Sequence, residues 1–151
     1  MNAQSPSKPV TAVAPLAWRD GALRLLDQRL LPATEGYVEC ATPAAVVDAI
    51  RTMVVRGAPA IGIAGAYAMV LAARDAWARA GARWREDWQT DVAAIREARP
   101  TAVNLAWAVE RMLEAAAGVG AGDPVPALLA RAQALHAEDL AANRRMGRLG
   151  A

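Results

Sequence analysis

The chain has 151 residues, of which 55% are hydrophobic and 21% charged, so it is long and apolar enough to fold as one domain. Its formal net charge is only +2, and acidic and basic residues are interspersed, which argues against the basic patch of a nucleic-acid-binding protein. The single cysteine, Cys40, excludes an internal disulfide and a paired-cysteine metal site, and favours a reducing, cytoplasmic setting.

The start of the chain is predicted to be a flexible tail over residues 1–14, followed by one domain over residues 15–151. Ser, Pro, Asn and Thr mix in the tail without periodicity. The prolines interrupt any apolar run of the kind that a signal peptide needs, so we expect none.

Three short strands are predicted next. Residues 16–19 and 22–27 are separated by Asp20-Gly21, a dipeptide typical of hairpin turns. Residues 36–40 form the third candidate, and together the segments predict a small antiparallel sheet.

The pattern then becomes helical. Thr42-Pro43 is predicted to begin the first helix, because the hydroxyl can accept a free backbone N–H and a proline there has none to leave unpaired. The apolar residues that follow recur at three- and four-residue spacing and predict one stripe on this helix: Val46, Val47, Ile50, Met53 and Val54.

A second helix, over about residues 59–79, is apolar on every side in its first half and is therefore predicted to be central. Gly62 and Gly65 would let neighbouring backbones approach it closely. The longest uncharged stretch, residues 57–73, is slightly short for a membrane span, so we expect a core helix and no membrane association.

Three more helices complete the prediction. One is marked by Trp84, Trp88, Val92 and Ile95 and ends at Arg99-Pro100; the others cover about residues 101–117 and the stretch from Asp123-Pro124 to the end of the chain. The fold class is therefore α+β and mostly helical, with a small N-terminal antiparallel sheet followed by a bundle of about five helices.

Familiar catalytic motifs are missing from the sequence. Gly57 and Gly62 have P-loop spacing, but Ile63 follows where a P-loop needs lysine. The only histidine, His136, has no ligand-type neighbours at metal-binding spacing, and we expect it at the surface. Cys40 has no basic neighbour to activate it and is predicted to be a small buried hydrophobe. We expect neither a metal nor another cofactor.

Two arginines precede predicted helix starts, where an anion could bind. Arg56 comes before Gly57 at the entrance to the central helix, and Arg99 precedes Pro100-Thr101. Unpaired N–H groups and the positive end of the helix dipole favour anions, and a guanidinium would add a planar clamp for phosphate oxygens. The alternative is an ordinary surface arginine, or one that pairs with the carbonyls of the preceding helix.

Two long segments resemble a known enzyme family. Residues 52–64, TMVVRGAPAIGIA, are similar to the signature of methylthioribose-1-phosphate isomerases, and so are residues 99–111, RPTAVNLAWAVER. Residues 25–32 and 138–147 also match, so the resemblance extends from Trp18 to the end of the chain.

The resemblance implies that Arg56, Gly57, Ala58 and Arg99 contact the substrate. It also implies that no catalytic residue lies in this chain, since the family's catalytic Cys and Asp belong to a Rossmann-like C-terminal domain that would follow Ala151. We thus expect a truncated chain or gene fragment that is inactive alone.

In the complete enzyme, the resemblance implies interconversion of 5-methylthioribose 1-phosphate and 5-methylthioribulose 1-phosphate in L-methionine salvage. It further implies a cytoplasmic homodimer that acts on a small sugar phosphate without a cofactor. The wider family leaves two alternatives open. One is a ribose-1,5-bisphosphate isomerase, and the other is a non-catalytic subunit like the alpha, beta and delta subunits of the translation-initiation exchange factor.

Overall fold

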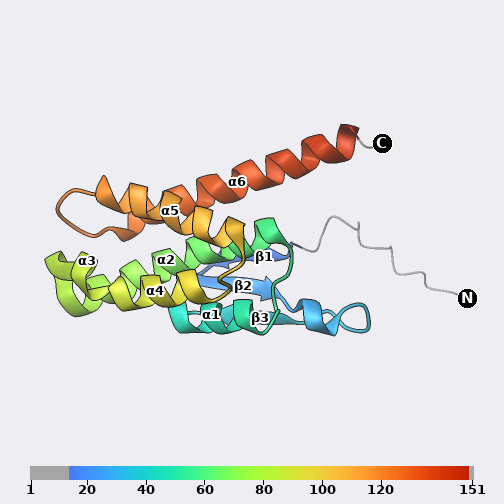
Figure 1. The fold of residues 1–151 in the computed structure, drawn as a ribbon, viewed down its shortest axis with the longest axis horizontal. Coiled ribbons are helices and arrows are strands. Elements are labelled where there is room, and N and C mark those ends of the chain that lie inside the picture. Colours follow the sequence, from blue (N-terminus) through green and yellow to red (C-terminus); the bar gives the residue numbers. More distant parts are fainter. Residues whose placement is uncertain (1–13, 150–151) are drawn as a thin grey trace, which may run out of the picture.

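The computed structural model describes residues 14–149, so the predicted tail lies outside the described residues except for Ala14. A small sheet and a set of helices pack around one long helix (Figure 1). This confirms the predicted α+β, mostly helical fold class.

The sheet has three antiparallel strands in the order β1-β2-β3, namely β1 Leu16–Arg19, β2 Ala22–Leu26 and β3 Tyr37–Cys40. Asp20 and Gly21 form the predicted turn between β1 and β2, with φ values of 53° and 74°. Leu25 pairs with Leu16, and Leu23 pairs with Cys40. These side chains are buried, so one face of the sheet covers the helical core.

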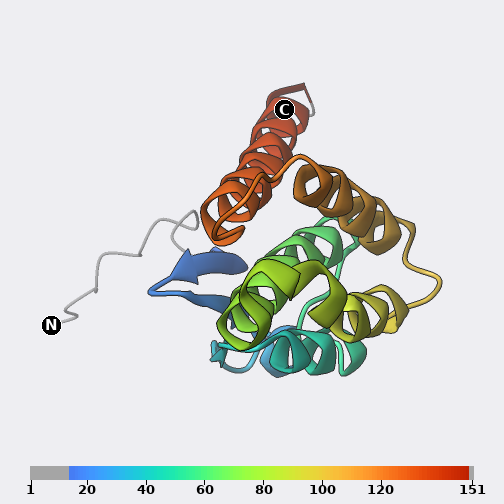
Figure 2. The same cartoon turned by 90° about the vertical axis from the view of Figure 1, so that its left-hand side faces the viewer.

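The first two helices are α1, Pro43–Arg51, and α2, Ala58–Ala80. Thr42 caps α1 as predicted, because its hydroxyl oxygen accepts the Ala45 N–H at 3.1 Å. Helix α2 is central, as predicted: Figure 2 shows the sheet, α1, α4, α5 and α6 arranged around it. Within residues 14–149, no helix has the length and apolar character that a membrane crossing needs.

The third predicted helix is divided in the structure. A short 3-10 turn, η3 Gly81–Arg83, leads into α3, Trp84–Asp87, and α4 follows over Gln89–Glu97. The break falls at Trp88, whose ψ of −3° departs from ideal helical geometry. Trp84 and Trp88 are both buried at this bend and pack edge to face, with ring centroids 4.9 Å apart.

The last two helices are α5, Val103–Ala117, and α6, Val125–Leu149. Helix α5 begins two residues later than predicted, because a turn closed by the Ala102 N–H and the Arg99 carbonyl (2.9 Å) occupies Pro100-Thr101. The Asp123 cap on α6 is confirmed, since its carboxylate accepts the Val125 N–H at 2.9 Å.

Helices α2 and α5 lie very close together. A Cβ atom on Gly62 would stand 2.9 Å from the Asn104 carbonyl oxygen, and one on Gly65 would collide with the Leu105 side chain. The predicted role of these two glycines is confirmed. Both helices begin at the same end of the bundle (Figure 1), which brings their N-termini together.

Candidate functional site

A cavity of about 410 Å³ lies at the end of the bundle where α2 and α5 begin. It contains all four residues that the sequence pointed to, Arg56, Gly57, Ala58 and Arg99. The remaining lining residues carry no charge and are Met53, Ile61, Thr101, Ala102, Val103 and Asn104. Two arginines separated by 42 other residues therefore share one pocket, while their role in binding stays a prediction.

The first turn of α2 has no side-chain cap. Gly57 occupies the N-cap position with φ 88° and ψ 131°, a conformation that favours glycine. Ile61 donates the first helical N–H, to the Gly57 carbonyl at 3.0 Å. The N–H groups of Ala58 and Ala60 precede this bond, so they are available to an acceptor at the positive end of the helix.

The first turn of α5 is also without a side-chain cap. Ala102 is its N-cap residue, and the Ala102 carbonyl accepts from Leu105 and Ala106. The N–H groups of Val103 and Asn104 come before these bonds. Two helix N-termini thus face one cavity, a combination that attracts an anion more strongly than either end alone.

The charges around the cavity are positive. Arg56 is exposed and Arg99 is half-buried, and within residues 14–149 neither guanidinium forms an ion pair. The charge of Arg56 acts on Asp27, but Asp27 is already paired with Arg29. Arg29 donates from Nε to Oδ1 at 2.9 Å and from Nη2 to Oδ2 at 2.8 Å. Arg29 is the main cause that lowers the pKa of Asp27, and Arg56 adds a smaller lowering.

An unexpected backbone motif positions Arg56. The N–H groups of Met53 and Val54 bond to the carbonyls of Ile50 (3.4 Å) and Ala49 (3.0 Å), and Met53 has φ 67°. This is a Schellman ending of α1 with methionine where glycine is usual. The predicted apolar stripe was therefore wrong at Met53, which is 43% exposed at the cavity. No local sequence signal marks this position.

The reactive side chains outside the cavity are structural. Cys40 is buried as predicted, and burial raises its pKa to about 11, which leaves it a poor nucleophile. The prediction for His136 was wrong: it is half-buried, and its Nδ1 lies 2.8 Å from the Tyr67 hydroxyl. Among the described residues, no group of His, Cys, Asp and Glu has the arrangement of a metal site.

Comparison with known proteins identifies the family of this chain. Residues 54–151 match the model of the initiation factor 2 subunit family. The chain belongs to this family. The crystal structure of 5-methylthioribose 1-phosphate isomerase from Pyrococcus horikoshii is similar to this chain, with a TM-score of 0.81 and 29% sequence identity. The match covers 90% of this chain and 39% of that one. The delta subunit of translation initiation factor eIF-2B from A. fulgidus gives 0.68 at 35% identity, over 83% of this chain and 37% of that one.

Two curated relatives of the chain share one name. The methylthioribose-1-phosphate isomerase of Methylococcus capsulatus is 57% identical over 142 residues, which cover 94% of this chain and 40% of the relative. That of Alkalilimnicola ehrlichii is 55% identical over 139 residues, covering 92% and 40%. The resemblance inferred from the sequence is confirmed, and the chain spans about 40% of the length of these relatives.

Proposed function

We propose that the cavity between Arg56 and Arg99 binds the phosphate of a sugar phosphate, and that the chain provides this part of a methylthioribose-1-phosphate isomerase. The supporting observation is the convergence of two guanidinium groups and two uncapped helix N-termini on one cavity. The names of the relatives supply the substrate, 5-methylthioribose 1-phosphate. The family resemblance implies 5-methylthioribulose 1-phosphate as its isomer.

Binding the substrate and isomerising it require different groups. An aldose locked as its 1-phosphate must open its ring and then move a proton between adjacent carbons, which needs a positioned acid and base. Among residues 14–149, the cavity lining contains no carboxylate, thiol or imidazole. We therefore expect this 151-residue chain to bind the substrate without turning it over, and measurable turnover by the purified chain would contradict this division.

The uncharged part of the lining favours a methylthio group over a second phosphate. Met53, Ile61 and Val103 offer apolar surface and no charge to balance another anion. Ribose 1,5-bisphosphate should consequently bind more weakly than 5-methylthioribose 1-phosphate in the same titration. The reverse order would favour the bisphosphate isomerase instead.

Substitution of the two arginines tests the proposal directly. Arg56→Ala and Arg99→Ala should each weaken binding of 5-methylthioribose 1-phosphate, measured by isothermal titration calorimetry, by about 10- to 150-fold. This range corresponds to about 1.5–3 kcal/mol for a hydrogen bond to a charged group. Arg83→Ala is the matched control, because Arg83 is 79% exposed and pairs with Glu86 away from the cavity.

Unchanged affinity in both variants would remove the proposed phosphate site. A well-folded chain with no measurable affinity for the sugar phosphate would instead favour a non-catalytic module. That second candidate rests on the likeness to the eIF-2B delta subunit.

A further inference from the structure

A second, smaller cavity of about 250 Å³ lies on the other side of the first turn of α2, where α2, α5 and α6 meet. Its floor is apolar and its charged residues are both acidic, in contrast to the cavity of Arg56 and Arg99. The lining residues are Pro59, Gly62, Ile63, Asn104, Trp107, Leu135, Glu138 and Asp139. Of the described residues, Asn104 alone lines both cavities.

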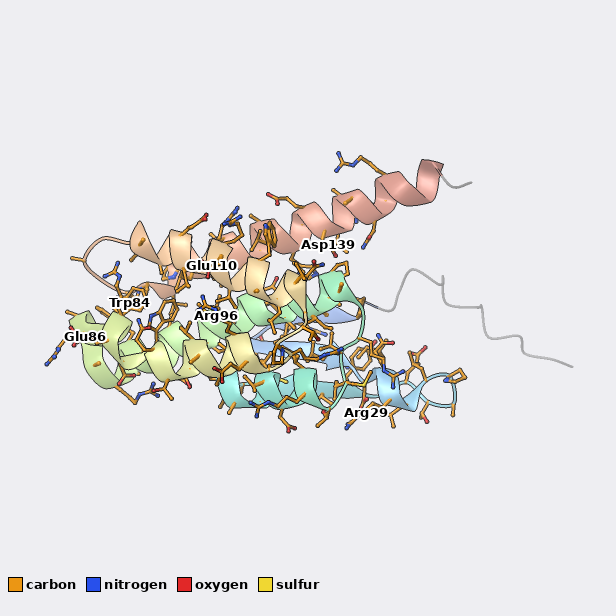
Figure 3. The ribbon with its side chains drawn as sticks, in the orientation of Figure 1. Arg29, Trp84, Glu86, Arg96, Glu110 and Asp139 are labelled. Carbon is orange, nitrogen blue, oxygen red and sulfur yellow. The ribbon has the colours of Figure 1, made fainter. Side chains whose placement is uncertain are left out.

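The acidic end of this cavity is suited to a positive charge. Figure 3 shows Asp139 on the part of α6 that overlies the beginning of α2. In the described part of the chain, neither Glu138 nor Asp139 forms an ion pair. The nearby N-termini of α2 and α5 each carry about half a positive charge, so two carboxylates still leave the site net negative.

The aromatic wall adds a preference for a cationic side chain. Trp107 is 48% exposed although it lines the cavity, and indole is the aromatic group that binds cations best. Its ring already lies 5.5 Å from the Arg111 guanidinium of the same helix, and Arg111 is also paired with Glu114. An apolar floor, an indole wall and an acidic end match the stem and the charged end of one long basic side chain.

We propose that this cavity receives a single arginine or lysine side chain from a protein surface that docks on this end of the bundle. The stem would lie against Gly62, Ile63 and Leu135, and the charge would meet the two carboxylates. A polypeptide fits better than a free small cation, because two apolar side chains at this end are also uncovered: Val103 is 78% exposed and Leu140 41% exposed. Flanking residues of a docked segment would cover both.

The proposal can be tested by following the indole N–H resonance of Trp107 by NMR, assigned with Trp107→Phe. Nα-acetyl-arginine amide should shift this resonance in a saturable way. Nα-acetyl-citrulline amide has the same shape without the charge, and its affinity should be at least about tenfold lower. The blocked tripeptide Leu-Arg-Leu should bind more tightly than the single amino acid, while agmatine should not.

Matched variants locate the binding site. Glu138→Gln combined with Asp139→Asn should weaken the arginine response about tenfold. Glu86→Gln, an exposed carboxylate at the opposite end of the bundle (Figure 3), should leave it unchanged. Arg56→Ala should also leave it unchanged, which separates this cavity from the sugar-phosphate site.

Equal binding of citrulline and arginine amides, or an arginine response that survives in the double variant, would overturn the proposal. Tighter binding of agmatine than of the tripeptide would overturn the assignment to a polypeptide. The Trp84 and Trp88 indole resonances, from buried residues of the α3–α4 bend, report whether each variant is folded. If the double variant unfolds, the single Glu138→Gln variant at an exposed position provides the same comparison.

Discussion

Tyr67 links three elements of the fold through its ring and its hydroxyl. Its ring stacks on Trp18 of β1, with centroids 5.3 Å apart and an interplanar angle of 10°. Its hydroxyl lies 2.8 Å from Nδ1 of His136 on α6. Burial raises the pKa of Tyr67 to about 12, so the hydroxyl keeps its proton and forms this hydrogen bond with a neutral imidazole. A part-buried polar contact of this kind fixes α6 against α2.

This contact predicts a pH-dependent stability. Burial lowers the pKa of His136 below its usual 6.5, with Asp139 opposing the shift. Below pH 6.5 the unfolded chain therefore takes up a proton before the folded chain does, and the free energy of unfolding falls. Urea unfolding at pH 7.5 and 5.5 should show this loss in the native chain. His136→Gln, which keeps an acceptor for Tyr67 but does not titrate, should lose less, and an equal loss would exclude His136 as the cause.

At the scale of elements, the close approach of α2 and α5 positions the proposed phosphate site. Gly62→Ala would place a methyl group 2.9 Å from the backbone oxygen of Asn104, which cannot move aside as a flexible side chain can. We expect a loss of about 1–3 kcal/mol in the free energy of unfolding, measured by urea denaturation, because overpacking forces backbone shifts.

The same displacement should weaken sugar-phosphate binding, since it moves the N-terminus of α5 away from that of α2. Gly120→Ala is the matched control, because a Cβ there meets nothing within 4 Å. A stable Gly62→Ala variant with unchanged affinity would show that the spacing of the two helices is not what positions the site.

Elements with local start signals could be predicted from the sequence. Asp20-Gly21 marks the first hairpin, Thr42-Pro43 the start of α1 and Asp123-Pro124 the start of α6, and each signal acts within a few residues. The bend at Trp88 was not predictable, because no Gly, Pro or capping residue marks it and its two indoles pack into the core.

The candidate site was predictable in part for the same reason. Arg56 and Arg99 are each recognisable beside a helix start, and the family resemblance singles out both. Their meeting in one cavity depends on the contact of Gly62 with Asn104, which only the fold reveals. The left-handed Met53 and the Tyr67–His136 bond likewise follow from tertiary packing and have no local signal.

For the whole molecule, the question is whether the sheet and the helices fold as one unit. Arg74 of α2 joins them: Nη1 donates to the Gly21 carbonyl at 2.7 Å and Nη2 to the Ala41 carbonyl at 2.5 Å. One guanidinium thus holds the first hairpin and the end of β3 on the central helix. The segment that follows β2 contacts the residues before Arg56, since the Gln28 N–H donates to the Val54 carbonyl at 2.9 Å. Attachment of the sheet to α2 therefore also supports the proposed phosphate site.

Arg74→Met should therefore destabilise the entire domain and not the sheet alone. We expect a loss of about 1.5–3 kcal/mol in the free energy of unfolding, since two charge-assisted bonds disappear and the part-buried Gly21 carbonyl loses its partner. Arg96→Met removes an exposed ion pair with Glu110 (Figure 3) and should cost about 1 kcal/mol or less. Urea unfolding followed by far-UV circular dichroism and by tryptophan fluorescence should give coincident transitions in both variants, because one cooperative unit unfolds at once. An Arg74→Met transition that separates into two steps would mean that the sheet unfolds independently of the helices.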